Sequence, residues 1–193
     1  MSSGVKEHGR RKAEGGKGKR KKTVSSLSPS PPRLSTFGSH VQQWEGGAAG
    51  TGFRFGIVLS RFNQSITDPL LKGALQLLET QGVRPEDIEV VKVPGAFEIP
   101  GAAKKLGSLG RFHALICLGA VIQGETPHFH YICSEVSRGI GQLSLELGMP
   151  VIFGVLTTNS MEQAIARSGN EMNKGAEAAM AAIEMAHIYQ KLK

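Results

Sequence analysis

Apolar residues along the chain form a repeating pattern that begins at residue 53. The run at 53–60 (FRFGIVLS) is nearly continuous, which is typical of a strand buried on both faces. A helical spacing of i, i+3, i+4, i+7 follows it, at Leu71, Ala74, Leu75 and Leu78. The pattern therefore predicts a strand, a short polar loop and an amphipathic helix.

The same alternation continues along the chain. Further strand-like runs cover 88–93, 113–118 and 150–156. Between these runs the sequence predicts a short Ala-rich helix near 97–106 and a longer helix at about 129–147.

Two more helices are predicted after the last strand. Ser160, followed three residues later by Gln163, has the form of a capping box, so a short helix should start there. A long C-terminal helix is predicted from Lys174 onward. Its apolar face would consist of Ala176, Ala179, Met180, Ile183 and Ala186.

Strands that alternate with helices favour a parallel sheet covered on both faces. We therefore predict an α/β fold: a three-layer sandwich with a four-stranded parallel sheet, flavodoxin-like, flanked by helices. Ligands of such folds bind beyond the carboxyl ends of the strands. Chemistry is therefore expected in the segments 61–63, 94–100, 119–130 and 153–159.

Residues 1–51 differ in composition from the rest. They are rich in Lys, Arg, Ser, Gly and Pro, with too few large apolar side chains to offset the entropy of ordering. We predict a disordered basic tail at 1–51 and an ordered domain at 52–193. Residues 1–34 contain ten of the 23 Lys and Arg residues and only two of the 16 acidic residues, so the rest of the chain is nearly neutral.

The role of the tail stays open. Its basic residues would attract nucleic acid, although no aromatic residue precedes Phe37. A basic, Ser-rich N-terminus is also typical of an organelle transit peptide or targeting segment, for which Glu7, Glu14 and the KGKRKK cluster at 17–22 are unusual.

The rest of the composition predicts a soluble, intracellular protein without a membrane segment. No run approaches the roughly 18 apolar residues of a membrane span, and no apolar segment follows the basic N-terminus as in a secretory signal. Cys117 and Cys133 lie in apolar surroundings rather than in a CxxC pair, which fits a reducing compartment. We expect a cytoplasmic location, or an organelle if the tail is a transit peptide.

Two side chains near the predicted strand ends are candidates for binding a ligand. Phe62 directly follows the first strand, where its ring could stack on a planar heterocycle or, alternatively, anchor the core. Glu98 lies inside the apolar PGAFEIP segment, where a carboxylate needs solvent or donors such as ligand hydroxyls. Helix capping is its alternative role.

A phosphate seat is a candidate at 119–126 (GAVIQGET). Its glycines would let backbone N–H groups approach an anion at the start of the next helix, and Thr126 adds a hydroxyl. Arg167 could clamp a phosphate bidentately or form a surface salt bridge. The chain has neither GxxxxGK[ST] nor a GxGxxG that opens a helix after the first strand, so no nucleotide fingerprint is present.

His128 is the candidate general acid and base, because an imidazole takes up and releases protons near neutral pH. A histidine packed beside Phe129 and Tyr131 is the alternative. His130 and Cys133 suggest a metal site, but residues 128 and 130 would point to different sides of a helix, so we predict no metal.

Six segments occur in a distinctive order: RFN at 61–63, PGAFEIP at 94–100, GAVIQGETPHF at 119–129, PVIFGVLTT at 150–158, RSG at 167–169 and NKGAEAA at 173–179. Together they carry a resemblance to the lumazine synthase family of riboflavin biosynthesis over about the last 140 residues. It implies a transferase that condenses 5-amino-6-(D-ribitylamino)uracil with 3,4-dihydroxy-2-butanone 4-phosphate to 6,7-dimethyl-8-ribityllumazine, with no cofactor.

The resemblance also implies roles for single residues. Those implied to hold the pyrimidine and its ribityl chain are Phe62, Ala96, Phe97, Glu98, Ala120, Val121, Ile122 and, from a neighbouring subunit, Phe153. Those implied to bind the phosphate are Glu125, Thr126 and Arg167. His128 takes the proton-donor position.

Members of this family assemble as homopentamers, and some build icosahedral shells of twelve pentamers. The segment 167–174 is about one residue shorter than in many relatives, which favours shells and leaves the role of Lys174 open. A non-catalytic module that binds flavin or lumazine is the alternative function, because a fold alone does not settle activity.

Overall fold

In the part of the chain that the structure describes, residues 41–169 and 172–192, four strands form one parallel sheet in the order β2-β1-β3-β4. This computed structural model gives the strands as β1 (Phe55–Ser60), β2 (Ile88–Val93), β3 (Ala114–Ile122) and β4 (Val151–Thr158). Phe55 at the start of β1 pairs with Ile88 of β2 and Ala114 of β3. The predicted four-stranded parallel sheet is confirmed.

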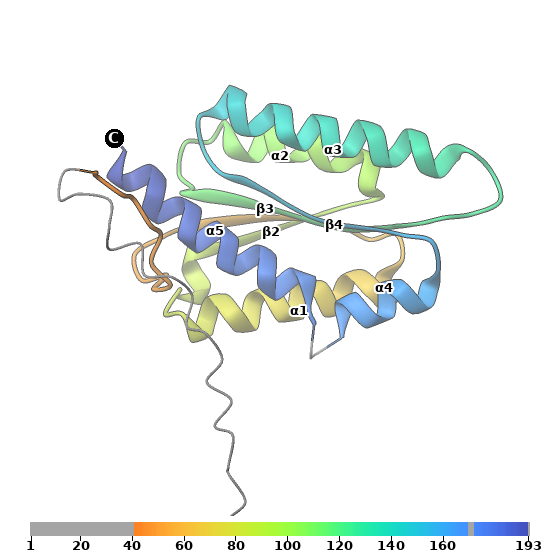
Figure 1. Ribbon diagram of the computed structural model, residues 1–193, viewed down its shortest axis with the longest axis horizontal. Helices are drawn as coiled ribbons and strands as arrows, with labels where there is room; N and C mark the ends of the chain where they lie inside the picture. Colours follow the sequence, from red (N-terminus) through yellow and green to blue (C-terminus); the bar gives the residue numbers. More distant parts are fainter. Residues whose placement is uncertain (1–40, 170–171, 193) are drawn as a thin grey trace, which may run out of the picture. The chain divides into compact units, whose positions relative to one another are not determined.

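Helices cover both faces of this sheet (Figure 1). One face carries α2 (Ile99–Gly107) and α3 (His128–Leu147), and the other carries α1 (Gln64–Thr80), α4 (Met161–Ser168) and α5 (Lys174–Lys191). Short 3-10 turns, η1 (Pro85–Asp87) and η2 (Ala96–Glu98), precede β2 and α2. The three-layer α/β sandwich is therefore as predicted.

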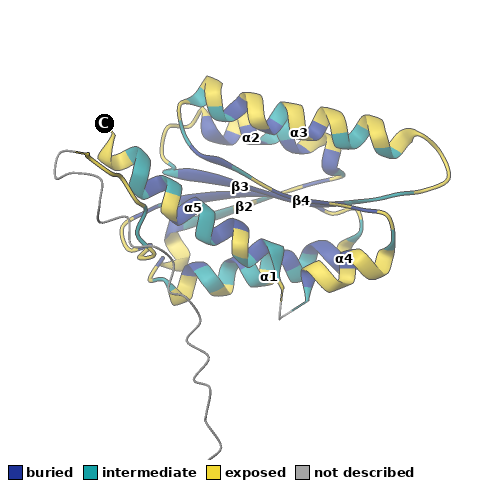
Figure 2. Ribbon diagram, in the orientation of Figure 1, coloured by how far each residue is buried: buried dark blue, intermediate teal, exposed yellow. Residues whose placement is uncertain are grey.

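The core consists of two apolar layers, one on each face of the sheet. Successive residues of a strand point to opposite faces, so Leu118 packs under α1 and α5 while Cys117 packs under α2 and α3. Figure 2 shows the buried strands between helices whose outer sides are exposed. Burial on both faces explains why the first strand is apolar almost throughout.

The third strand is longer than predicted. We expected it to end at Leu118 because glycine follows, yet β3 continues to Ile122, which pairs with Thr158 of β4. Gly119 serves close packing rather than a turn, because a Cβ there would lie 3.1 Å from the side chain of Ile99. Residues 120–122 consequently belong to a strand and not to a loop.

The apolar face of the C-terminal helix is rotated relative to the predicted one. Ala179, Ile183 and Ala186 are buried as expected, but Ala178 and Ala182 are buried in place of Ala176 and Met180. α5 packs against both α1 and the sheet, so its buried stripe is wider than one helical seam.

Residues 42–53 lead into β1 and contact the C-terminal helix. The Lys191 ammonium donates to the Glu45 carbonyl (2.8 Å), and Nε2 of His187 lies 2.7 Å from the Ala49 carbonyl oxygen. Most of the predicted tail, residues 1–40, lies outside the described residues. Among the described helices, none is both long and apolar enough to cross a membrane.

Candidate active site

A pocket of about 640 Å³ opens at the carboxyl ends of β1, β2 and β3. Its walls come from the segments after β1 and β2, the end of β3 and the first turn of α3. The structure brings together in this pocket most of the predicted site residues, namely Phe62, Ala96, Phe97, Glu98, Ala120, Val121, Ile122, Thr126 and His128. This is where ligands of doubly wound sheets bind.

The loop that carries Phe62 is fixed by backbone hydrogen bonds and by one amide. The Arg61 and Phe62 N–H groups donate to the Val93 and Pro94 carbonyls (2.8 and 3.1 Å). Asn63 adopts the left-handed conformation (φ 59°, ψ 48°), which asparagine tolerates better than most residues. These contacts hold the Phe62 ring at the rim of the pocket, where 68% of it is exposed.

The Asn63 amide also reaches the strand that forms the pocket floor. Its Nδ2 donates to the carbonyl of Ala120 at 3.0 Å. The alternative role of Phe62 as a core anchor is excluded by the exposure of its ring. Asn63 was not singled out from the sequence, although its type at a strand-to-helix turn is a usable signal.

Glu98 faces the same pocket from the turn after β2. It occupies the N-cap position of α2, yet its side chain makes no capping hydrogen bond. A Cβ at Gly95 would lie 3.0 Å from the Glu98 Oε2, so a glycine there leaves room for the carboxylate. The structure therefore shows no capping hydrogen bond from Glu98, which instead lines the pocket.

His128 is the first residue of α3 and is exposed to the pocket. Because His128 is exposed, and Phe129 contacts the ring of His130 (centroids 5.4 Å apart), the predicted alternative of a packed His128 is not what the structure shows. The N-cap residue Pro127 supplies no side-chain hydrogen bond to the first turn. The N-terminus of α3 is therefore suited to an anion.

Thr126 lies next to this helix start and lines the pocket, while Glu125 is exposed beside it and does not line it. Two of the three residues predicted to seat a phosphate, Glu125 and Thr126, thus fall near one helix N-terminus.

Large aromatic side chains surround the pocket and remain exposed. Phe97 in η2 is 57% exposed and Tyr131 in α3 is 69% exposed, and both line the pocket. Exposed aromatic groups clustered around a cavity are typical of a surface that a ligand or another chain covers. Tyr131 was missed as a lining residue, although it is one turn after His128 and shares its helix face.

Arg167 and Phe153 lie elsewhere in the chain. They line a second hollow of about 410 Å³ along the edge strand β4 and helix α5, together with Lys174. An Arg167 Nη1–H donates to the backbone carbonyl of Gln163 (3.0 Å), which replaces the predicted alternative of a surface salt bridge. The Lys174 ammonium is paired with the Glu177 carboxylate (2.7 and 2.8 Å).

The predicted site residues therefore fall into two groups within one chain. Phe62 and His128 share the first pocket, whereas Phe153 and Arg167 line the second hollow. β4 is an edge of the sheet, and Phe153 on it is 43% exposed. One chain alone does not bring the arginine to the imidazole.

The cysteines contribute no reactive thiolate. Complete burial raises the pKa of the Cys117 thiol to about 12, and partial burial also raises the pKa of Cys133. Both remain protonated near neutral pH, which excludes them as nucleophiles.

Fold and pocket together define an α/β protein with a ligand-sized pocket at the carboxyl edge of a parallel sheet, lined by a glutamate and a histidine among mostly apolar residues. Residues 52–190 match the sequence model of the family described as 6,7-dimethyl-8-ribityllumazine synthase. A 6,7-dimethyl-8-ribityllumazine synthase of Desulfatibacillum aliphaticivorans is 54% identical over 150 residues, which cover 77% of this chain and 97% of that relative.

The chain therefore belongs to the 6,7-dimethyl-8-ribityllumazine synthase family, as its six motifs predicted. It is a transferase with the lumazine synthase reaction of riboflavin biosynthesis.

Proposed function

We propose that the first pocket binds 5-amino-6-(D-ribitylamino)uracil and condenses it with 3,4-dihydroxy-2-butanone 4-phosphate. The products are 6,7-dimethyl-8-ribityllumazine, phosphate and water. The observation that carries this proposal is the convergence of an exposed ring, a carboxylate and an imidazole, those of Phe62, Glu98 and His128, on one cavity at the sheet edge.

The pyrimidine stacks on Phe62, whose exposed ring stands at the rim. The backbone of residues 120–122 at the end of β3 supplies hydrogen bonds to the edge of the ring. Ala96, Phe97 and Glu98 hold the ribityl chain, with the Glu98 carboxylate accepting hydrogen bonds from its hydroxyls.

The phosphate of the four-carbon substrate binds at the N-terminus of α3. Backbone N–H groups there and the hydroxyl of Thr126 face the anion, and Glu125 contributes through its backbone. Arg167 reaches the same phosphate from a neighbouring chain, because within its own chain it lines the second hollow.

The chemistry consists of proton transfers around carbon–nitrogen bond formation. The 5-amino group adds to the ketone, and loss of water gives an imine. Loss of the C3 proton then expels phosphate from C4 and leaves an enol, which tautomerises to a ketone at C3. The ribitylamino nitrogen attacks this new carbonyl and closes the ring with loss of a second water. His128 donates and accepts the protons, while much of the acceleration comes from holding both substrates in one cavity.

Such a site requires a homo-oligomer. Phe153 on the edge strand closes the pocket of the adjacent chain, and its exposure in the single chain supports this arrangement. We propose a homopentamer in which each interface joins the first pocket of one chain to the second hollow of the next.

The test is an assay of the purified chain with both substrates, followed by the absorbance of the lumazine and by phosphate release. We expect equal amounts of lumazine and phosphate, and none when either substrate is omitted. Phe62→Leu should raise the KM for the pyrimidine, while Phe37→Leu, the same exchange outside the family match, should not. Binding of the pyrimidine without turnover would instead support the non-catalytic module.

A further inference from the structure

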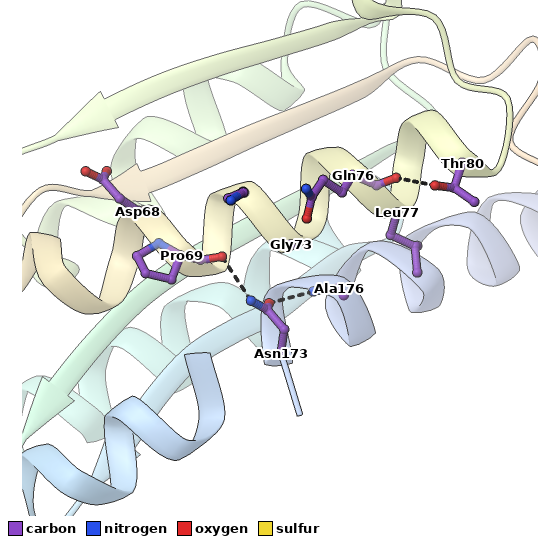
Figure 3. A pocket seen from close by; sticks show the side chains of 9 residues that line it. Asp68, Pro69, Gly73, Gln76, Leu77, Thr80, Asn173 and Ala176 are labelled. Carbon is purple, nitrogen blue, oxygen red and sulfur yellow. Dashed lines mark hydrogen bonds between the residues drawn. The ribbon is translucent and has the colours of Figure 1, made fainter. Parts of the chain in front are cut away.

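The side-chain amide of Asn173 joins three helices, and Figure 3 shows its hydrogen bonds to Pro69 of α1 and Ala176 of α5. Its Oδ1 accepts hydrogen bonds from the N–H groups of Gly175 (2.9 Å) and Ala176 (3.1 Å), which caps α5. Its Nδ2 donates to the carbonyls of Pro69 in α1 (2.9 Å) and Ser168 at the end of α4 (2.8 Å). Both amide hydrogens and both acceptor sites of the oxygen are thus in use.

Two glycines allow this close approach of helices. A Cβ at Gly73 of α1 would overlap the Asn173 amide, and a Cβ at Gly175 of α5 would overlap the carbonyl of Leu70. α1 and α5 therefore meet backbone against backbone at the Asn173 side chain. Such a contact has one tightly defined geometry, because there are no flexible side chains to absorb a shift.

The elements that Asn173 ties together carry the cations of the second hollow. Arg167 directly precedes Ser168, whose carbonyl the amide holds, and Lys174 directly follows Asn173 as the first residue of α5. Both cations line the hollow with Phe153. Asn173 thus lies between Arg167 and Lys174 in the sequence, and its amide is hydrogen-bonded to the backbone next to each of them.

We propose that Asn173 is a positioning residue for the phosphate site. By fixing the end of α4 to the start of α5 and both to α1, its amide sets the separation of Arg167 and Lys174. That separation determines how the hollow receives the phosphate of the four-carbon substrate. The inference rests on the phosphate-binding role proposed for Arg167.

If Asn173 only capped α5, it would stabilise the helix without affecting phosphate binding. The test variants must therefore separate capping from positioning. Asn173→Ser keeps a hydroxyl that caps a helix N-terminus, but it lacks the amide hydrogens that reach Pro69 and Ser168. The exchange leaves the charge unchanged. Gly73→Ala is the second variant, because its added Cβ displaces the Asn173 amide without altering either cation.

Each variant has a matched control. Gly101→Ala is the same exchange in α2, at a position where nothing lies within 4 Å of the added Cβ. Ile183→Val removes one methyl group from the buried contact of α5, so it lowers stability without touching the amide. All variants are assayed as the assembled protein, with Tm recorded for each.

We expect both test variants to raise the KM for the butanone phosphate about five- to tenfold, the size of effect that the loss of one ordinary hydrogen bond produces. The KM for the pyrimidine should stay within about twofold of wild type, as should both KM values in the two controls. An unchanged KM for the phosphate substrate in both test variants, or an equal rise in Ile183→Val, would overturn the proposal.

Binding of inorganic phosphate, measured by calorimetry, separates this inference from the proposed function. A wild-type protein that forms no lumazine would refute the function, yet Asn173→Ser should still bind phosphate more weakly than wild type. Equal phosphate affinity of the two proteins would refute the positioning role by itself.

Discussion

Small and polar residues set the geometry of the pocket at the scale of single positions. Asn63 adopts the left-handed conformation and ties the Phe62 loop to Ala120, and Gly95 leaves room for the Glu98 carboxylate. None of these contacts is apolar, so none follows from a hydrophobic pattern. They decide where the ring and the carboxylate stand, and hence which ligand the pocket can accept.

His128→Ala should lower kcat by about 10²-fold without abolishing turnover, because a general acid and base contributes roughly 10²–10⁴-fold and the positional part of catalysis remains. His130→Ala is the matched control, since its ring contacts Phe129 and does not line the pocket. Steady-state kinetics with both substrates measure the effect. An unchanged kcat in His128→Ala would remove the imidazole from the mechanism.

The buried thiol of Cys117 predicts a loss of stability at alkaline pH. Its pKa is raised from 9.0 to about 12 by burial, so above pH 9 the unfolded chain loses this proton while the folded chain keeps it. Stability is unaffected by this thiol below its unfolded pKa and falls as pH rises, by roughly 1.4 kcal/mol per pH unit between these two values.

Urea unfolding at pH 8 and pH 10 checks this prediction. The difference in the free energy of unfolding between the two pH values should be smaller in Cys117→Ala than in wild type. Because Lys and Tyr residues titrate in both proteins, the comparison isolates the thiol. The same difference in both proteins would contradict the account.

At the scale of elements, most strands and helices followed from the sequence, and the misses have physical causes. The capping box at Ser160 is confirmed, since Ser160 accepts from the Gln163 N–H and α4 starts at the next residue. The predicted end of β3 was wrong because a glycine inside a buried strand looks like a turn signal in the sequence. The predicted apolar face of α5 was rotated from the observed one. The helix packs against both α1 and the sheet, whereas the prediction assumed one apolar stripe.

Ser160→Ala should lower the free energy of unfolding by about 1 kcal/mol, the usual cost of losing a helix N-cap. The Gln163 Oε1 in turn accepts a hydrogen bond from the Asn159 N–H (3.0 Å), so Gln163→Ala should also destabilise, and the double variant should lose less than the sum. Chemical unfolding of the three variants measures this coupling. Strict additivity would show that the two bonds do not act as one cap.

At the scale of the whole molecule, the site residues lie in two groups, which the proposed function joins across two chains. The pocket with Phe62 and His128 could be predicted, because the carboxyl ends of parallel strands meet at one edge. The separation of Arg167 from that pocket could not be predicted from the residues, because a sequence does not show which surfaces of two copies meet. Only the family resemblance indicated a shared site, and the single chain is consistent with it through the exposed Phe153 on its edge strand.

The most direct test of this shared site is complementation between two defective variants. His128→Ala and Arg167→Ala are produced together with different affinity tags, and mixed oligomers are isolated through both tags in succession. If each site joins His128 of one chain to Arg167 of the next, about a quarter of the interfaces in a random mixture keep both residues. The account predicts roughly that fraction of wild-type activity in the mixed oligomer. Activity no higher than the average of the two separate variants would contradict it.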